Sequence, residues 1–73
     1  MKNKKAKNLI SFIEQNSTSI NYEHQDTGNY ASVILRSDNL NFTENQINLI
    51  LNYCKENKLS YFISFIYKGI VVL

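Results

Sequence analysis

Two side chains in this sequence have the chemistry of nucleophilic catalysis: Cys54 and His24, each the single residue of its type. A thiol beside an imidazole can act as a nucleophile and base pair. Cys54, however, follows Ile47 and Ile50 at helical spacing, which predicts a buried and unreactive thiol. His24 ends an alternating segment, where a partly exposed and hydrogen-bonded imidazole is typical. We therefore expect no catalytic residues and no enzymatic activity.

Side chains that could bind a metal or link the chain covalently are equally scarce. One cysteine cannot form an internal disulfide, and one histidine does not complete a Cys/His zinc set. The carboxylates of Glu23, Asp26 and Asp38 lie near expected turns, where acidic side chains are usually solvated. Phosphate-binding, dinucleotide-binding and EF-hand motifs are missing from the sequence. We expect neither a metal nor a cofactor, and oligomerisation is the remaining way for so small a chain to gain stability.

The net charge of +2 is unevenly distributed. Four basic residues face six acidic ones from residue 8 onward, and the other four basic residues precede them. Such a cluster could contact phosphates, so the alternative function is a small nucleic-acid-binding or regulatory protein. Because cations at a helix N-terminus oppose the helix dipole, we expect residues 1–7 to be a frayed tail and residues 8–73 to form a single domain. The possible nucleic-acid contacts are Lys2, Lys4, Lys5 and Lys7.

The first half of the chain predicts a helix followed by a hairpin. Apolar residues recur at helical spacing from residue 6, and the polar run 16–19 ends that helix. Residues 19–24 alternate between polar and apolar side chains, as in a half-buried strand. The turn-forming run 26–29 leads into a second strand at 30–36.

The second half predicts the same order again. Thr43 and Gln46 form a capping box, and the helix that they begin continues to residues 57–58 with Ile47, Ile50, Leu51 and Cys54 on its buried side. Residues 60–67 and 70–73 are rich in β-branched and aromatic side chains and flank a two-residue turn at 68–69. The predicted fold is α+β, a two-layer sandwich of order α-β-β-α-β-β, with two helices on one face of a four-stranded, largely antiparallel sheet.

The second hairpin is apolar on both faces, whereas the first is apolar mainly on one. One layer of helices covers only one face, so large apolar side chains on the other face should need a partner. A second copy of the chain is the default partner, and the N-terminal helix of the same protomer is the alternative cover. The expected interface residues are Phe62, Ile66, Val71 and Leu73.

These patterns favour a small non-catalytic module that binds a protein. The chain is short and rich in residues with A+T-rich codons, which favours a phage or mobile-element inhibitor of the anti-CRISPR or anti-restriction type that sterically blocks a larger host protein. A structural homodimer subunit is a further alternative. The apolar run at 9–13 is too short for a secretory signal and the run at 59–73 falls short of the roughly 17 residues of a membrane span, so we expect a cytoplasmic protein without a membrane partner.

Overall fold

The computed structural model describes residues 1–16, 19–37 and 41–73. Asp38 lies outside the described residues, so its expected turn position is not tested. The helices are α1 (Asn3–Asn16) and α2 (Glu44–Glu56), and the strands are β1 (Ile20–Asp26), β2 (Ala31–Ser37), β3 (Tyr61–Ser64) and β4 (Gly69–Val72).

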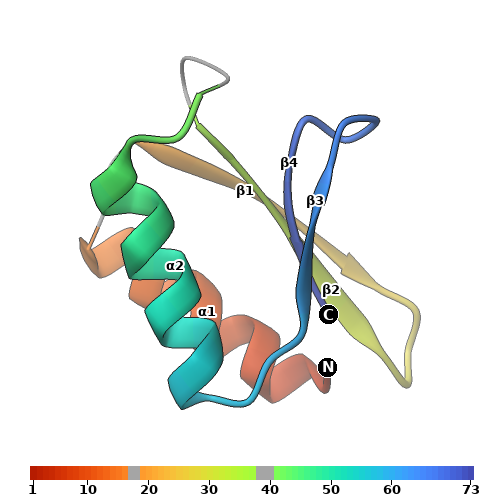
Figure 1. Cartoon of the computed structure of the whole chain (residues 1–73). Coiled ribbons are helices and arrows are strands. Elements are labelled where there is room, and N and C mark those ends of the chain that lie inside the picture. Colours follow the sequence, from red (N-terminus) through yellow and green to blue (C-terminus); the bar gives the residue numbers. More distant parts are fainter. Residues whose placement is uncertain (17–18, 38–40) are drawn as a thin grey trace.

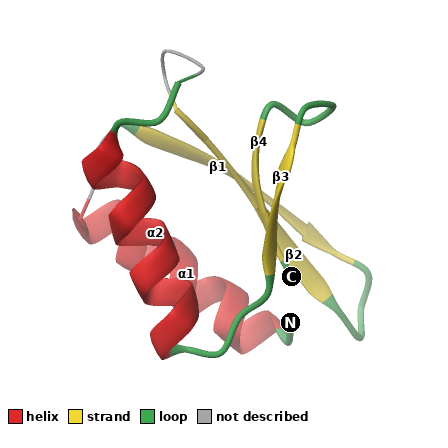
Figure 2. Ribbon diagram, viewed as in Figure 1, coloured by secondary structure: helices red, strands yellow, loops and turns green. Residues whose placement is uncertain are grey.

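The strands form one antiparallel sheet in the order β1-β2-β4-β3. Both helices lie on the same face of this sheet (Figures 1 and 2). The predicted α+β fold of order α-β-β-α-β-β is therefore confirmed. The order of the strands, which the sequence does not determine, puts β3 at an edge and β4 in the centre.

Gly69 gives a physical reason for the central position of β4. A Cβ atom at Gly69 would collide with the carbonyl oxygen of Leu35 on β2, and it would lie 3.1 Å from Cγ of Arg36. The Arg36 side chain continues over this position and donates from Nε to the carbonyl oxygen of Tyr67, at 2.8 Å. A residue without a side chain therefore lets β4 approach β2 closely, beneath the stem of Arg36.

The turn of the second hairpin differs from the prediction. Residues 65–68 form a four-residue turn, in which Lys68 takes the left-handed conformation (φ 55°) and the hydroxyl of Ser64 accepts a hydrogen bond from the backbone N–H of Tyr67 at 3.1 Å. Val71 consequently pairs with Phe62 instead of Ile66. The shift covers an even number of residues, so strand side chains keep their predicted faces, because orientation alternates with a period of two.

The capping box of α2 is confirmed. The Thr43 hydroxyl accepts from the backbone N–H of Gln46 at 3.1 Å, and the Gln46 side chain accepts from the backbone N–H of Thr43 at 2.9 Å. At the other end of α2, Lys58 is left-handed (φ 56°), and its backbone N–H donates to the carbonyl of Lys55. The backbone N–H of Leu59 donates to the carbonyl of Cys54 at 2.9 Å. These two bonds are those of a Schellman motif, which ends the helix and turns the chain toward β3.

The N-terminus is more ordered than the sequence predicts. Helix α1 begins at Asn3, and the backbone of Met1 exchanges two hydrogen bonds with Ala31, at 2.7 and 3.0 Å. Met1 and Ala6 are buried. Met1 and Ala6 thus tie the start of the chain to β2 and the core, and these tertiary contacts outweigh the few tenths of a kcal/mol by which lysines oppose the helix dipole.

The core fills the space between the helices and the sheet. Helix α1 buries Ala6, Leu9 and Ile13. Helix α2 buries Ile50 and Cys54 but leaves Leu51 half-buried and Ile47 exposed, contrary to the prediction for Ile47. Strands β2 and β4 contribute the side chains that point toward the helices. Fully buried members of this cluster are Leu9, Ile13, Val33, Leu35, Ile50, Cys54 and Val72.

Candidate protein-docking surface

The most exposed apolar side chains of the described residues are concentrated in the second hairpin. Of the nine exposed large hydrophobic residues, six belong to the run 61–67. Phe65 and Ile66 in the turn are 91% and 88% exposed, and Ile63 on β3 is 70% exposed. We call these six residues the hairpin cluster: Tyr61, Phe62, Ile63, Phe65, Ile66 and Tyr67.

The hairpin cluster is large for a protein of this size. Bulky side chains carry about 150–250 Å² each, so the exposed fractions of these six leave on the order of 700 Å² bare. The largest apolar patch of a typical monomer is about 300–600 Å². A stable interface buries about 800 Å² on each partner. This exposed area is divided between the two faces and the tip of the hairpin, and only its sum is close to what one partner of a stable interface buries.

The backbone of β3 also has unused hydrogen-bonding capacity. The N–H of Leu73 donates to the carbonyl of Ser60 at 2.8 Å, which makes these two a hydrogen-bonded pair of the ladder. Hydrogen-bonded and non-hydrogen-bonded pairs alternate in an antiparallel ladder. Phe62 therefore points its backbone groups at β4, whereas Tyr61 and Ile63 point theirs outward. Among the described strands β3 has β4 as its one neighbour, so it offers these outward groups to a further strand.

The two edges of the sheet differ in chemistry. Strand β1 carries Glu23, His24 and Asp26, and charged side chains on an edge discourage pairing with another chain. Strand β3 has the sequence Tyr-Phe-Ile-Ser, without a charge or a proline. Only the β3 edge is thus open to strand addition by this criterion.

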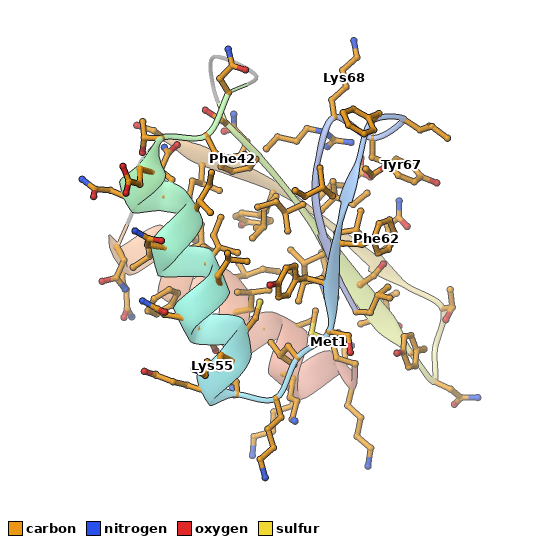
Figure 3. All side chains as sticks on the ribbon, viewed as in Figure 1. Met1, Phe42, Lys55, Phe62, Tyr67 and Lys68 are labelled. Atoms are coloured by element: carbon orange, nitrogen blue, oxygen red, sulfur yellow. The ribbon has the colours of Figure 1, made fainter. Side chains whose placement is uncertain are left out.

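A pocket of about 420 Å³ adjoins the hairpin cluster on the helix side of the sheet. It lies between the N-terminal end of α2, where Phe42 is located (Figure 3), and the β3–β4 hairpin. Ile47 is one of the residues that line this opening, which agrees with its exposure. The apolar lining residues of the pocket include Phe42, Ile47, Ile63, Phe65 and Ile70.

The structure divides the four interface residues expected from the sequence into two pairs. Phe62 and Ile66 are exposed, and Phe62 points away from the helices (Figure 3). Val71 is only 5% exposed and Leu73 is half-buried. Both helices lie on the opposite face, so α1 does not cover these residues. Val71 instead lies in register between Ile34 and Phe62, in the middle of the sheet, where neighbouring strands restrict access.

Ile63 and Phe65 are strongly exposed, although neither is among the interface residues expected from the sequence. Ile63 lies on the helix side of β3, and Phe65 belongs to the turn that follows it. The surplus of apolar residues in the second hairpin indicates that some of them are exposed, but the sequence does not show which strand of the hairpin lies at the edge of the sheet. The exposed surface is therefore the edge and tip of the hairpin, whereas the prediction placed it across the open face.

The lysines near the N-terminus form a separate surface. Lys2, Lys4, Lys5 and Lys7 are all exposed, and Nζ of Lys5 donates to the carbonyl of Asn57 at 3.5 Å. Met1, which precedes them, and Lys68 in the hairpin turn lie at opposite ends of the molecule in Figure 3. A nucleic-acid contact through these lysines, which stays a prediction, would leave the hairpin cluster free.

Cys54 and His24 occupy different environments. Cys54 is completely buried, as predicted, and burial raises the pKa of its thiol above the usual value. His24 is half-buried on β1, and its Nε2 atom has no hydrogen-bond partner among the described residues. In the same residues, no three His, Cys, Asp or Glu side chains are grouped so that they could hold a metal ion.

Burial of Cys54 leads to a prediction about its reactivity. Because only the exposed thiolate is nucleophilic, we expect the folded protein to react with a disulfide reagent such as Ellman's reagent at least about a hundredfold more slowly than the unfolded chain. The rate is measured with and without denaturant. A Ser11→Cys/Cys54→Ala variant, with its thiol on the exposed side of α1, is the control and should react at once. Rapid modification of Cys54 in native buffer would contradict the buried position.

Fold and surface together define a small α+β domain with an uncovered apolar hairpin. No family model matches this chain, and neither the curated proteins nor the solved structures contain a significantly similar one. No helix in residues 1–16, 19–37 or 41–73 has the length and hydrophobicity to cross a membrane.

Proposed function

We propose that this protein is a small, non-catalytic module that binds another protein through the tip of its second hairpin. The observation that supports this most directly is the exposure of Phe65 and Ile66, which are bare at a turn that projects from the domain. Exposing two large apolar side chains at a tip is unfavourable for a free protein. It becomes favourable where a partner buries them, since aromatic side chains that enter a pocket often dominate binding energy.

The shape of this region indicates the form of the partner. The tip is convex, so it fits an apolar recess on the partner. The pocket behind it can in turn receive an apolar side chain from the partner, because its lining includes Phe42, Ile47 and Phe65. Lys68 lies beside the tip and favours an acidic residue near the recess. The partner's binding site is thus an apolar depression with negative charge at its margin.

An inhibitor encoded by a phage or mobile element, of the anti-CRISPR or anti-restriction type, is the specific form of this proposal. A domain of this size would act by steric blocking of a larger host protein. The small size and the A+T-rich codons of the chain support an inhibitor of this origin. The exposed hairpin tip supports only the general proposal that the chain binds a protein.

The proposal is tested by capturing partners with two matched double variants. Phe65→Ser/Ile66→Ser removes the apolar tip, whereas Tyr22→Ser/Tyr30→Ser removes two exposed aromatic residues elsewhere on the surface. Each protein is immobilised and incubated with lysate of the source cell, and the bound proteins are identified by mass spectrometry. We expect a protein that is retained by the wild type and by the tyrosine variant to be lost from the tip variant. Equal retention by both variants would contradict docking through the tip.

A further inference from the structure

The edge of β3 has a symmetry that the hairpin tip lacks. The residues with outward backbone groups, Tyr61 and Ile63, are separated by one residue, Phe62, which is also central to the stretch 60–64 that pairs with β4. When a strand pairs antiparallel with a copy of itself, the two-fold axis passes through the middle of the pairing segment, so an axis at Phe62 brings the outward groups of Tyr61 opposite those of Ile63. The β3 edge is therefore complementary to itself.

We propose that two copies of the chain pair through their β3 edges, antiparallel, about a two-fold axis at Phe62. The two four-stranded sheets then continue into one another. Tyr61 exchanges N–H···O bonds with the partner's Ile63, and the axis generates the equivalent pair. This pairing uses all the outward backbone groups that the ladder gives to Tyr61 and Ile63.

The side chains fit the same register. On the helix side, Tyr61 lies opposite the partner's Ile63, and pairs of aromatic and β-branched residues across strands are favourable. On the other side, Phe62 lies opposite its own copy at a non-hydrogen-bonded position, where the Cα atoms are about 4.5 Å apart and side chains are in close contact. Each of these side chains is exposed in the single protomer, so all three gain cover at once.

A second strand explains the exposure on both sides of β3 better than a partner on one face does. Ile63 is 70% exposed on the helix side, while Phe62 is exposed on the opposite side. A partner that packs on either face leaves the other side chain bare. A strand alongside β3 contacts both, because its own side chains alternate between the two faces.

Charge does not oppose pairing between two copies of this strand. Like charges opposite one another destabilise a strand pair. In this register β3 lies opposite itself, and it carries no charged residue that self-pairing would repel. The segment 60–64 is short, and small interfaces usually bind weakly. We therefore expect a dimer that dissociates on dilution.

This inference goes beyond the proposed function and uses other residues. Phe65 and Ile66 belong to the turn and lie outside the paired segment 60–64. The symmetric dimer therefore carries two hairpin tips, one on each protomer. Such a dimer would bind a partner that has two recesses more tightly than one protomer does.

The association is tested by sedimentation and light scattering over a range of concentrations. We expect a mass that rises from 8.5 kDa toward twice that value as concentration approaches the millimolar range. Ile63→Lys places like charges near the axis, so it should raise the dissociation constant at least about tenfold. Far-UV circular dichroism confirms that this variant is folded. A wild type that stays monomeric throughout, leaving the edge for a foreign strand, would overturn the proposal.

The register is tested by cross-linking through introduced cysteines in a Cys54→Ala background. Phe62→Cys puts two thiols across the axis at the separation that a disulfide requires, whereas Ser64→Cys on the same face puts each thiol opposite Ser60 of the partner subunit. Mild oxidation should thus convert the first variant to a covalent dimer much faster than the second. Equal rates would refute this register. Phe65→Ser/Ile66→Ser should keep the dimer, so that loss of partner capture and loss of dimerisation are independent results.

Discussion

Replacing Gly69 by alanine is expected to lower the free energy of unfolding by about 1–3 kcal/mol, a large share of the stability of so small a domain. The added Cβ would collide with the carbonyl oxygen of Leu35, which is backbone in a central strand and cannot move aside without disturbing the β2–β4 pairing. Arg36 would also have to shift from above this position and give up its hydrogen bond to Tyr67.

Gly28→Ala is the matched control for this prediction. A Cβ atom at Gly28 meets nothing within 4 Å, but its φ of +93° strains any residue with a side chain. We expect Gly28→Ala to cost about 1 kcal/mol, through conformation alone. Urea unfolding followed by circular dichroism measures both values. If Gly69→Ala proves as stable as the wild type, the close approach of β4 to β2 is wrong.

Truncation of Ile13 to alanine is expected to have the largest effect, a loss of about 2–5 kcal/mol. Ile13 is completely buried between α1 and the sheet, so its removal leaves a cavity. A chain of 73 residues has a total stability of only about 4–11 kcal/mol. The variant should therefore lose a large part of its stability and show a strongly lowered melting temperature.

Ile66→Ala removes the same atoms from a side chain that is 88% exposed, so it serves as the control for Ile13→Ala. We expect its stability to stay within about 0.5 kcal/mol of the wild type. Thermal unfolding of the two variants at low concentration, where the monomer dominates, compares them directly. A similar loss in both would show that the tip is packed, which would also remove the basis for docking through Ile66.

Different residues of the second hairpin contribute to folding stability and to the proposed binding. The Ile66 side chain adds little to folding and is available to a partner, whereas Gly69 and Val71 in the same hairpin hold the sheet together. Substitutions at the tip should thus change binding without unfolding the protein. Substitutions in β4 should unfold it, so they are unsuitable as tests of binding.

Sequence periodicity determined the elements and their faces. The capping box at Thr43 and Gln46 located the start of α2, because its hydrogen bonds are local and depend on residues three positions apart. The alternation in the strands assigned each side chain to the helix side or the open side. The hairpin turn differs from the predicted one, but the pairing register differs by an even number of residues, so the assigned faces are unchanged. The burial of Cys54 followed in the same way from its spacing to Ile50.

Only the tertiary structure decided which of these apolar side chains are covered. Both strands of the second hairpin are apolar enough to be central, and the choice of β4 depends on the fit of Gly69 beneath Arg36 and against Leu35, contacts between residues far apart in the chain. The same long-range packing ordered Met1 against Ala31 and left Ile63 bare. Periodicity reports which face a side chain takes, whereas exposure at an edge depends on which strand has a neighbour, and that is a property of the assembled sheet.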